Sequence, residues 1–135
     1  MSEFPIFIPG TPIPQGSHAV SKTGHVFESN NRLRPWRETM SHTLTAWTGT
    51  WFGAWEPFDG PLLVDVTFHM PRPKRPKYSL PAVTPDADKL CRALGDAMTT
   101  SGLIRDDARI TTWHARKRYS DTPGITIHAI REDKP

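Results

Sequence analysis

The sequence lacks the residues that would cross-link it or hold it in a membrane. Cys91 is the only cysteine in 135 residues, so no internal disulfide can form, and no Cys/His spacing resembles a zinc site. No apolar run approaches the roughly 20 residues that span a bilayer, and the first residues lack a signal-peptide pattern. We therefore expect a soluble protein of the reducing cytoplasm with no membrane partner.

Hydrophobic residues are also scarce. They make up 36% of the chain, and its 14 prolines and 9 glycines indicate many loops around a modest core. A chain of this length fits one domain, which we take to be residues 1–135. Because a small core often gains stability by pairing with a second subunit, a homodimer is the expected assembly.

The charge is positive and unevenly distributed. Seventeen Lys and Arg oppose 14 Asp and Glu, giving a net charge of +3 and a sequence pI near 9.3, which suits an anionic partner. One basic cluster lies within residues 71–77 and comprises Arg72, Lys74, Arg75 and Lys77. A second comprises Arg116, Lys117 and Arg118. Side chains of a run on a strand point to both faces, so a solvated sheet edge explains the second cluster equally well.

Hydrophobic periodicity and turn residues predict an α+β domain with a mixed β-sheet and helices packed on one face. Residues 71–85 contain five prolines, so we expect an irregular, exposed connection there. The expected elements are strand 4–8 near a sheet edge, a hairpin over 18–27 turning at 22–24, a helix from Pro35 to about Gly49, strand 61–70, helix 87–98, and strands 109–119 and 125–130.

Trp47, Trp51 and Trp55 are spaced four residues apart. Gly49, Gly53 and the threonines between them disfavour one continuous helix. A core or subunit-contact cluster is the main interpretation, since tryptophan is usually buried. Stacking of one ring on a DNA base is the alternative.

Two carboxylates, Asp86 and Asp88, stand where the proline-rich connection meets a helix. Positions two apart on a helix point to different sides. These side chains can therefore converge if Asp86 is still extended and Asp88 either caps the helix or lies in its first turn. Magnesium commonly uses one or two carboxylates plus water and phosphate, which suits so small a set. Asp107 follows the helix and a turn at Ser101 and Gly102, and an antiparallel return would bring it back beside the pair.

Each acidic pair also has a purely structural interpretation. Asp-x-Asp before a helix is common as a cap, and Asp-Asp is commoner still in turns. The neighbouring basic residues favour a phosphate-binding role instead, because a protein that binds phosphate needs positive surface beside an acidic pocket.

These motifs, taken in order, resemble the RusA-type Holliday junction resolvases, or crossover junction endodeoxyribonucleases. The firmest stretch is residues 68–110, with His69-Met70-Pro71, Pro85-Asp86-Ala87-Asp88-Lys89-Leu90, Gly95-Asp96-Ala97, Gly102-Leu103-Ile104 and Asp106-Asp107-Ala108-Arg109-Ile110. A looser similarity covers Pro9-Gly10-Thr11-Pro12, Gly24-His25-Val26-Phe27 and Trp36-Arg37.

The resemblance implies a homodimeric nuclease, common in phages and prophages, that binds four-way DNA junctions. It implies Mg²⁺, with Mn²⁺ as a substitute, and paired nicks on two symmetry-related strands. Its metal-binding and catalytic acids fall on Asp86, Asp88 and Asp107, with Asp106 a weaker candidate. Arg92 joins them as a catalytic candidate.

Two positions depart from the family's pattern. Lys89 replaces the usual asparagine, and Arg92 replaces a lysine, which keeps a cation that can hardly donate a proton. Both residues have the alternative of lying on a solvated helix face. The expected DNA-binding residues are Arg72, Lys74, Arg75, Lys77, Lys89, Arg116 and Lys117.

Two other functions remain open at this point. One is a non-catalytic module that binds branched DNA, in which the acidic residues serve only in helix caps and turns. The other is a metal-dependent nuclease that acts on flaps or other branched DNA.

Overall fold

A computed structural model describes residues 4–16, 18–20, 26–28, 31–50 and 54–135 of the chain, with backbone alone for 18–20 and 26–28. Its elements are β1 (Ile6–Pro9), β2 (His18–Val20), β3 (Val26–Glu28), α1 (Leu33–Gly49), β4 (Leu62–Pro71), α2 (Ala87–Thr100), the 3-10 helix η1 (Asp107–Arg109), β5 (Ile110–Ser120) and β6 (Gly124–Glu132). Each predicted element is present with its ends moved by a few residues. The predicted hairpin is confirmed by the antiparallel pair β2 and β3, while its turn lies outside the described residues.

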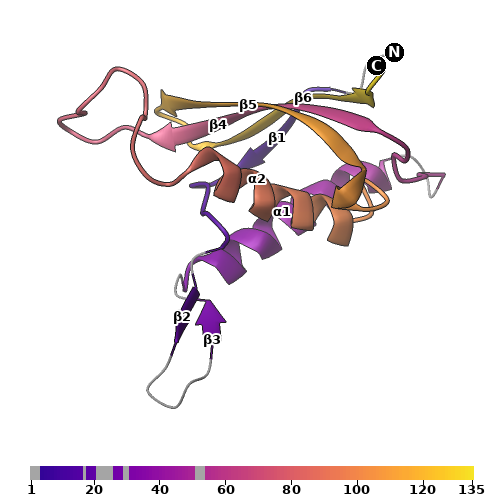
Figure 1. Cartoon of the computed structure of the whole chain (residues 1–135), viewed down its shortest axis with the longest axis horizontal. Helices are drawn as coiled ribbons and strands as arrows, with labels where there is room; N and C mark the ends of the chain where they lie inside the picture. Colours follow the sequence, from indigo (N-terminus) through magenta and orange to yellow (C-terminus); the bar gives the residue numbers. More distant parts are fainter. Residues whose placement is uncertain (1–3, 17, 21–25, 29–30, 51–53) are drawn as a thin grey trace.

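Four strands form one sheet in the order β1-β6-β4-β5. The central strand β4 pairs in parallel with β5 and antiparallel with β6, so the sheet is mixed. Figure 1 shows α1 and α2 together beneath one face of the sheet. The predicted α+β class, the mixed sheet, the helices on one face and the edge position of β1 are therefore confirmed.

The alternation along β4 explains which face the helices cover. Its helix-facing side chains are buried hydrophobics: Leu62, Val64, Val66, Phe68 and Met70. Thr67 belongs to the opposite, open face, yet only 5% of it is exposed. It is covered because its hydroxyl oxygen lies 2.8 Å from His128 Nε2 and accepts from Arg116 Nη1 at 3.1 Å.

Helix α1 buries one stripe against the sheet. The stripe contains Leu33, Trp36, Met40, Leu44 and Thr48. The four-residue spacing continues to Thr48 and leaves Trp47 half-buried. Trp47 instead packs edge-on against Trp55 with ring centroids 5.1 Å apart, and both rings lie against the core. Trp51 lies outside the described residues.

Helix α2 begins at Ala87 as predicted and ends at Thr100, two residues beyond the predicted end. Asp86 is its N-cap residue and is extended, with φ −70° and ψ 141°. After the C-cap residue Ser101, Gly102 takes φ +78°, a conformation that favours glycine. The Gly102 and Leu103 amides donate back to Thr99 and Met98 carbonyls at 3.1 and 3.0 Å. This closed turn reverses the chain toward the flank of α2.

The connection between β4 and α2 is irregular, as its prolines predict. In Figure 1 it extends beyond the end of the sheet and returns to the first turn of α2. The basic cluster at residues 72–77 lies in this connection and therefore stands close in sequence to the acidic pair. Neither described helix has the length and apolar character needed to cross a bilayer.

Candidate active site

The acidic pair stands at the N-terminus of α2, one residue on each side of Ala87. Asp86 is extended and Asp88 lies in the first helical turn, which is the condition under which the two carboxylates can converge. Both residues are exposed. Asp88 Oδ2 accepts from Lys89 Nζ at 2.8 Å, and this hydrogen bond lowers the pKa of the Asp88 carboxyl. Asp88 is therefore an anion that solvent or a ligand can reach.

Asp107 approaches the same helix further along. A Cβ atom added to Gly95 would lie 3.3 Å from Asp107 Cβ, so the absence of a side chain at Gly95 lets η1 come this close. Gly95 is seven residues beyond Asp88, about 10 Å along the helix axis at 1.5 Å per residue. The antiparallel return that we expected is present, but it meets α2 about two turns beyond the acidic pair.

One pocket nevertheless joins most of the predicted site. It has a volume of about 440 Å³ and is lined by Ala87, Asp88, Cys91, Arg92, Gly95, Asp107 and Trp113. Asp86 is not among its lining residues. Within residues 4–135, wherever the chain is described, no three His, Cys, Asp or Glu side chains gather closely enough to hold a metal ion. Asp88, Arg92 and Asp107 thus share a pocket, and the three-carboxylate site stays a prediction.

Negative charge is concentrated around Asp107. Its pKa is raised, first by the hydrogen bond with Asp106, then by burial and by the charges of Asp96 and Asp106. Asp106 itself caps η1, because its Oδ1 accepts from the Ala108 amide at 3.0 Å, and this lowers its pKa. Asp106 therefore has the structural role of a cap, consistent with its weaker place among the candidates.

The sequence interpretation missed two polar residues beside this pocket. Asp96 acts electrostatically on Asp107, and its Oδ2 accepts a hydrogen bond from Gln15 Nε2. Gln15 Oε1 is buried, and no partner for it lies among the described residues. Asp96 belonged to a motif of the resemblance, which was the available signal, whereas Gln15 follows β1 and is brought here only by the fold.

Arg92 and Lys89 are restrained by a neighbouring segment. Gly16 has φ +122°, and a Cβ there would lie 2.9 Å from Lys89 Cδ and 3.4 Å from Arg92 Nη1. The Gln15 amide also donates to the Lys89 carbonyl at 3.0 Å. Both cations therefore lie against the segment that follows β1. Arg92 also lines the acidic pocket, and its side chain is exposed.

Cys91 lines the same pocket but is an unsuitable nucleophile. Only 8% of it is exposed, and burial raises the pKa of its thiol to about 11. The thiol is therefore neutral at physiological pH, and we assign it a packing role.

The basic residues divide into two sets. Arg72, Lys74, Arg75 and Lys77 are all exposed, and none forms an ion pair with a described acidic residue. The second cluster is split by strand alternation. Arg116 donates to Asp65 at 2.9 Å on the open face of the sheet, whereas Lys117 Nζ donates to the Val83 and Pro85 carbonyls, each at 2.8 Å. Only Lys117 faces the helix side, where the acidic pocket lies.

An acidic pocket beside an exposed basic connection is the arrangement expected of an enzyme that acts on a phosphate backbone. The model of the endodeoxyribonuclease RusA family matches residues 9–130, and the chain belongs to this family. Membership implies the nuclease activity of Holliday junction resolvases, which bind branched DNA junctions and generally depend on a divalent metal. No curated protein sequence matches the chain significantly.

The close approach at Gly95 gives a test of the pocket. In Gly95→Ala we expect junction cleavage to fall about tenfold, because Asp107 must move by a few tenths of an ångström and small displacements of catalytic groups are costly. Thermal unfolding should show an intact fold, since alanine favours helix. Gly49→Ala at the end of α1 is the matched control, because a Cβ there meets nothing within 4 Å. Equal cleavage by both variants would show that the position of Asp107 does not affect the reaction.

Proposed function

We propose that this chain is a Mg²⁺-dependent Holliday junction resolvase, of phage or prophage origin, that acts as a homodimer and nicks two symmetry-related strands. The observation that carries the proposal is that Asp88, Arg92 and Asp107 line one pocket, at the end of a connection whose basic side chains are exposed. Family membership supplies the reaction class. A two-fold dimer suits a junction with matching arms, because each subunit would meet an equivalent strand.

The residues present fit a hard divalent cation. The donors are carboxylate oxygens, which Mg²⁺ prefers, and Mg²⁺ usually keeps several waters and takes only one or two carboxylates. The pKa of Asp107 is raised by the hydrogen bond with Asp106, by burial, and then by the negative charges of Asp96 and Asp106, which a cation would offset. Asp88 and Asp107, joined by Asp86, are the residues we propose to hold the ion. When bound, it would supply Lewis acidity that activates water and offsets charge on the phosphate.

The chain's own cation has a separate role. Arg92 lines the same pocket as Asp88 and Asp107, and its guanidinium carries donors only. We propose that its guanidinium orients the phosphate and stabilises the charge that develops during cleavage. Because arginine can hardly release a proton, protonation of the leaving oxygen is left to water.

The second function still favoured by an observation is the non-catalytic module. Asp88 already pairs with Lys89, and Asp106 caps η1, as that function would require. A synthetic four-way junction, a flap and a linear duplex of matched length distinguish the candidates when each is incubated with and without Mg²⁺. We expect paired nicks in the junction with Mg²⁺ only. Binding without cleavage would support the module, and faster cutting of the flap would support the other nuclease.

A further inference from the structure

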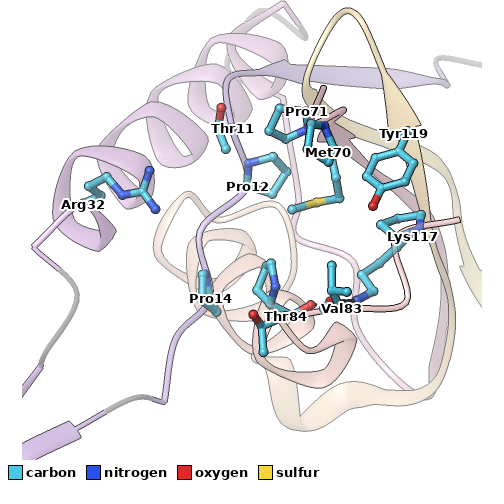
Figure 2. A pocket seen from close by; sticks show the side chains of 13 residues that line it. Thr11, Pro12, Pro14, Arg32, Met70, Pro71, Val83, Thr84, Lys117 and Tyr119 are labelled. Carbon is cyan, nitrogen blue, oxygen red and sulfur yellow. Dashed lines mark hydrogen bonds between the residues drawn. The ribbon is translucent and has the colours of Figure 1, made fainter. Parts of the chain in front are cut away.

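A second pocket lies on the other side of the segment that carries the acidic pair. It has a volume of about 500 Å³, within the range of ligand sites. Its walls come from the chain after β1, the residue before α1, the ends of β4 and β5, and the end of the connection before α2. Figure 2 shows these segments around one hollow, with the Met70 side chain ending inside it and the Tyr119 ring along one side.

The walls suit a flat, apolar ring with an anionic chain attached. Proline rings form much of the surface, together with Met70 and the aromatic ring of Tyr119. Bases stack on aromatic and apolar surfaces without regard to sequence. Arg32 and Lys117 also line the pocket, whereas no Asp or Glu does among the described residues. A nucleobase with its phosphates fits this combination of flat apolar walls and positive charge.

The pocket is placed to meet a strand that passes the acidic site. Pro85 lines it, and Ala87 and Asp88, two and three residues further on, line the acidic pocket. Pro71 and Pro73 line its other end, where the basic cluster begins. Lys117 fixes the wall between the two pockets, because its Nζ donates to the Val83 and Pro85 carbonyls, each at 2.8 Å.

We propose that this pocket receives an unstacked nucleobase next to the phosphate that is cut. The inference rests on the proposed function, because it places the cut phosphate at the neighbouring acidic site. Bases at a branch point are less firmly held than in a continuous duplex, so one can leave the stack at low cost. Occupation of the pocket would fix the phosphate relative to Asp88 and would hold the strand in one register.

Val83 is the best position at which to block the pocket. It lines the pocket, and 45% of its surface is exposed, so a larger side chain there can fill the hollow without disturbing the core. Leu80 provides a matched control in the same connection. It is 49% exposed and does not line the pocket. We therefore compare Val83→Trp with Leu80→Trp.

The test measures junction affinity by fluorescence anisotropy in EDTA, so that it does not depend on cleavage. Each junction carries one abasic nucleotide, moved in turn through the positions around the branch point. At one position we expect the wild type to bind about tenfold more weakly, as loss of a stacked base predicts. Val83→Trp should bind the intact junction about as weakly as the wild type binds that abasic junction, and it should lose no further affinity for the abasic junction. Leu80→Trp should behave as the wild type does with both junctions.

Three results would overturn the inference. One is that the wild type binds every abasic junction as tightly as the intact one, and another is that Val83→Trp keeps the full abasic penalty. A change in the molecular mass of Val83→Trp in light scattering would assign the pocket to a contact between subunits. A different failure would be that the abasic nucleotide and Val83→Trp affect affinity as expected but the wild type does not cleave the junction in Mg²⁺. That result would contradict the proposed function and leave the base pocket supported.

Discussion

Asp88→Asn should abolish junction cleavage while junction affinity stays unchanged. Asparagine keeps the size of the side chain but removes the charge that we propose for the metal site, and loss of one such electrostatic group commonly lowers the rate by about 10²-fold or more. Asp88 is exposed, and its hydrogen bond to Lys89 lies at the surface, so thermal stability should not change measurably. Cleavage and anisotropy assays on one protein preparation measure both quantities.

Asp121→Asn is the matched control for this substitution. Asp121 is exposed in the turn between β5 and β6 and lines neither the acidic pocket nor the pocket proposed to receive a base. It should cut and bind as the wild type does. If Asp88→Asn cleaves at the wild-type rate, Asp88 takes no part in the reaction. If its junction affinity falls together with its cleavage rate, Asp88 has a role in DNA binding instead.

The double charge reversal Arg72→Glu/Arg75→Glu should weaken junction binding about tenfold or more at moderate salt. Both side chains are exposed without ion pairs among the described residues, so they are available to phosphates. Each lost phosphate contact lowers the slope of log affinity against log salt by about 0.9, which gives a decrease of about 2 for the pair. A salt titration of binding by the double variant and the wild type measures this slope.

The control must carry the same change of charge away from the connection. Arg131→Glu/Lys134→Glu does so, because β6 runs antiparallel to β4 and Glu132 pairs with Leu62, at the opposite end of β4 from Pro71. This control should keep the wild-type slope. Equal slopes for both double variants would show that net charge matters and that the basic cluster has no particular role.

The fold was largely predictable because its signals are local. The alternation along β4, the apolar stripe of α2 and the glycine after it each require only neighbouring residues. The extended Asp86 and the helical Asp88 meet the condition for convergence that the sequence suggested. Strand order was not, since β1 and β6 are far apart in sequence and pair only through tertiary packing.

The candidate site was less predictable because its geometry depends on contacts between distant segments. The depth at which Asp107 meets α2 is set by the turn after Ser101 and by the missing side chain of Gly95. Spacing alone could not distinguish a return to Asp88 from a return two turns later. Strand alternation did predict that Arg116 and Lys117 point to opposite faces. Which of the two faces carries the acidic pocket could not be predicted, because that depends on where α2 packs.

The most direct test of the account is metal binding by the protein without DNA. Isothermal titration with Mg²⁺ and Mn²⁺ should show binding to the wild type and to the Asp121→Asn control. Asp107→Asn and Asp88→Asn should each weaken binding by about tenfold or more, because both carboxylates are proposed to hold one ion. If Asp107→Asn binds the metal as tightly as the wild type, the two sides of the pocket do not share an ion, and the proposed site is contradicted.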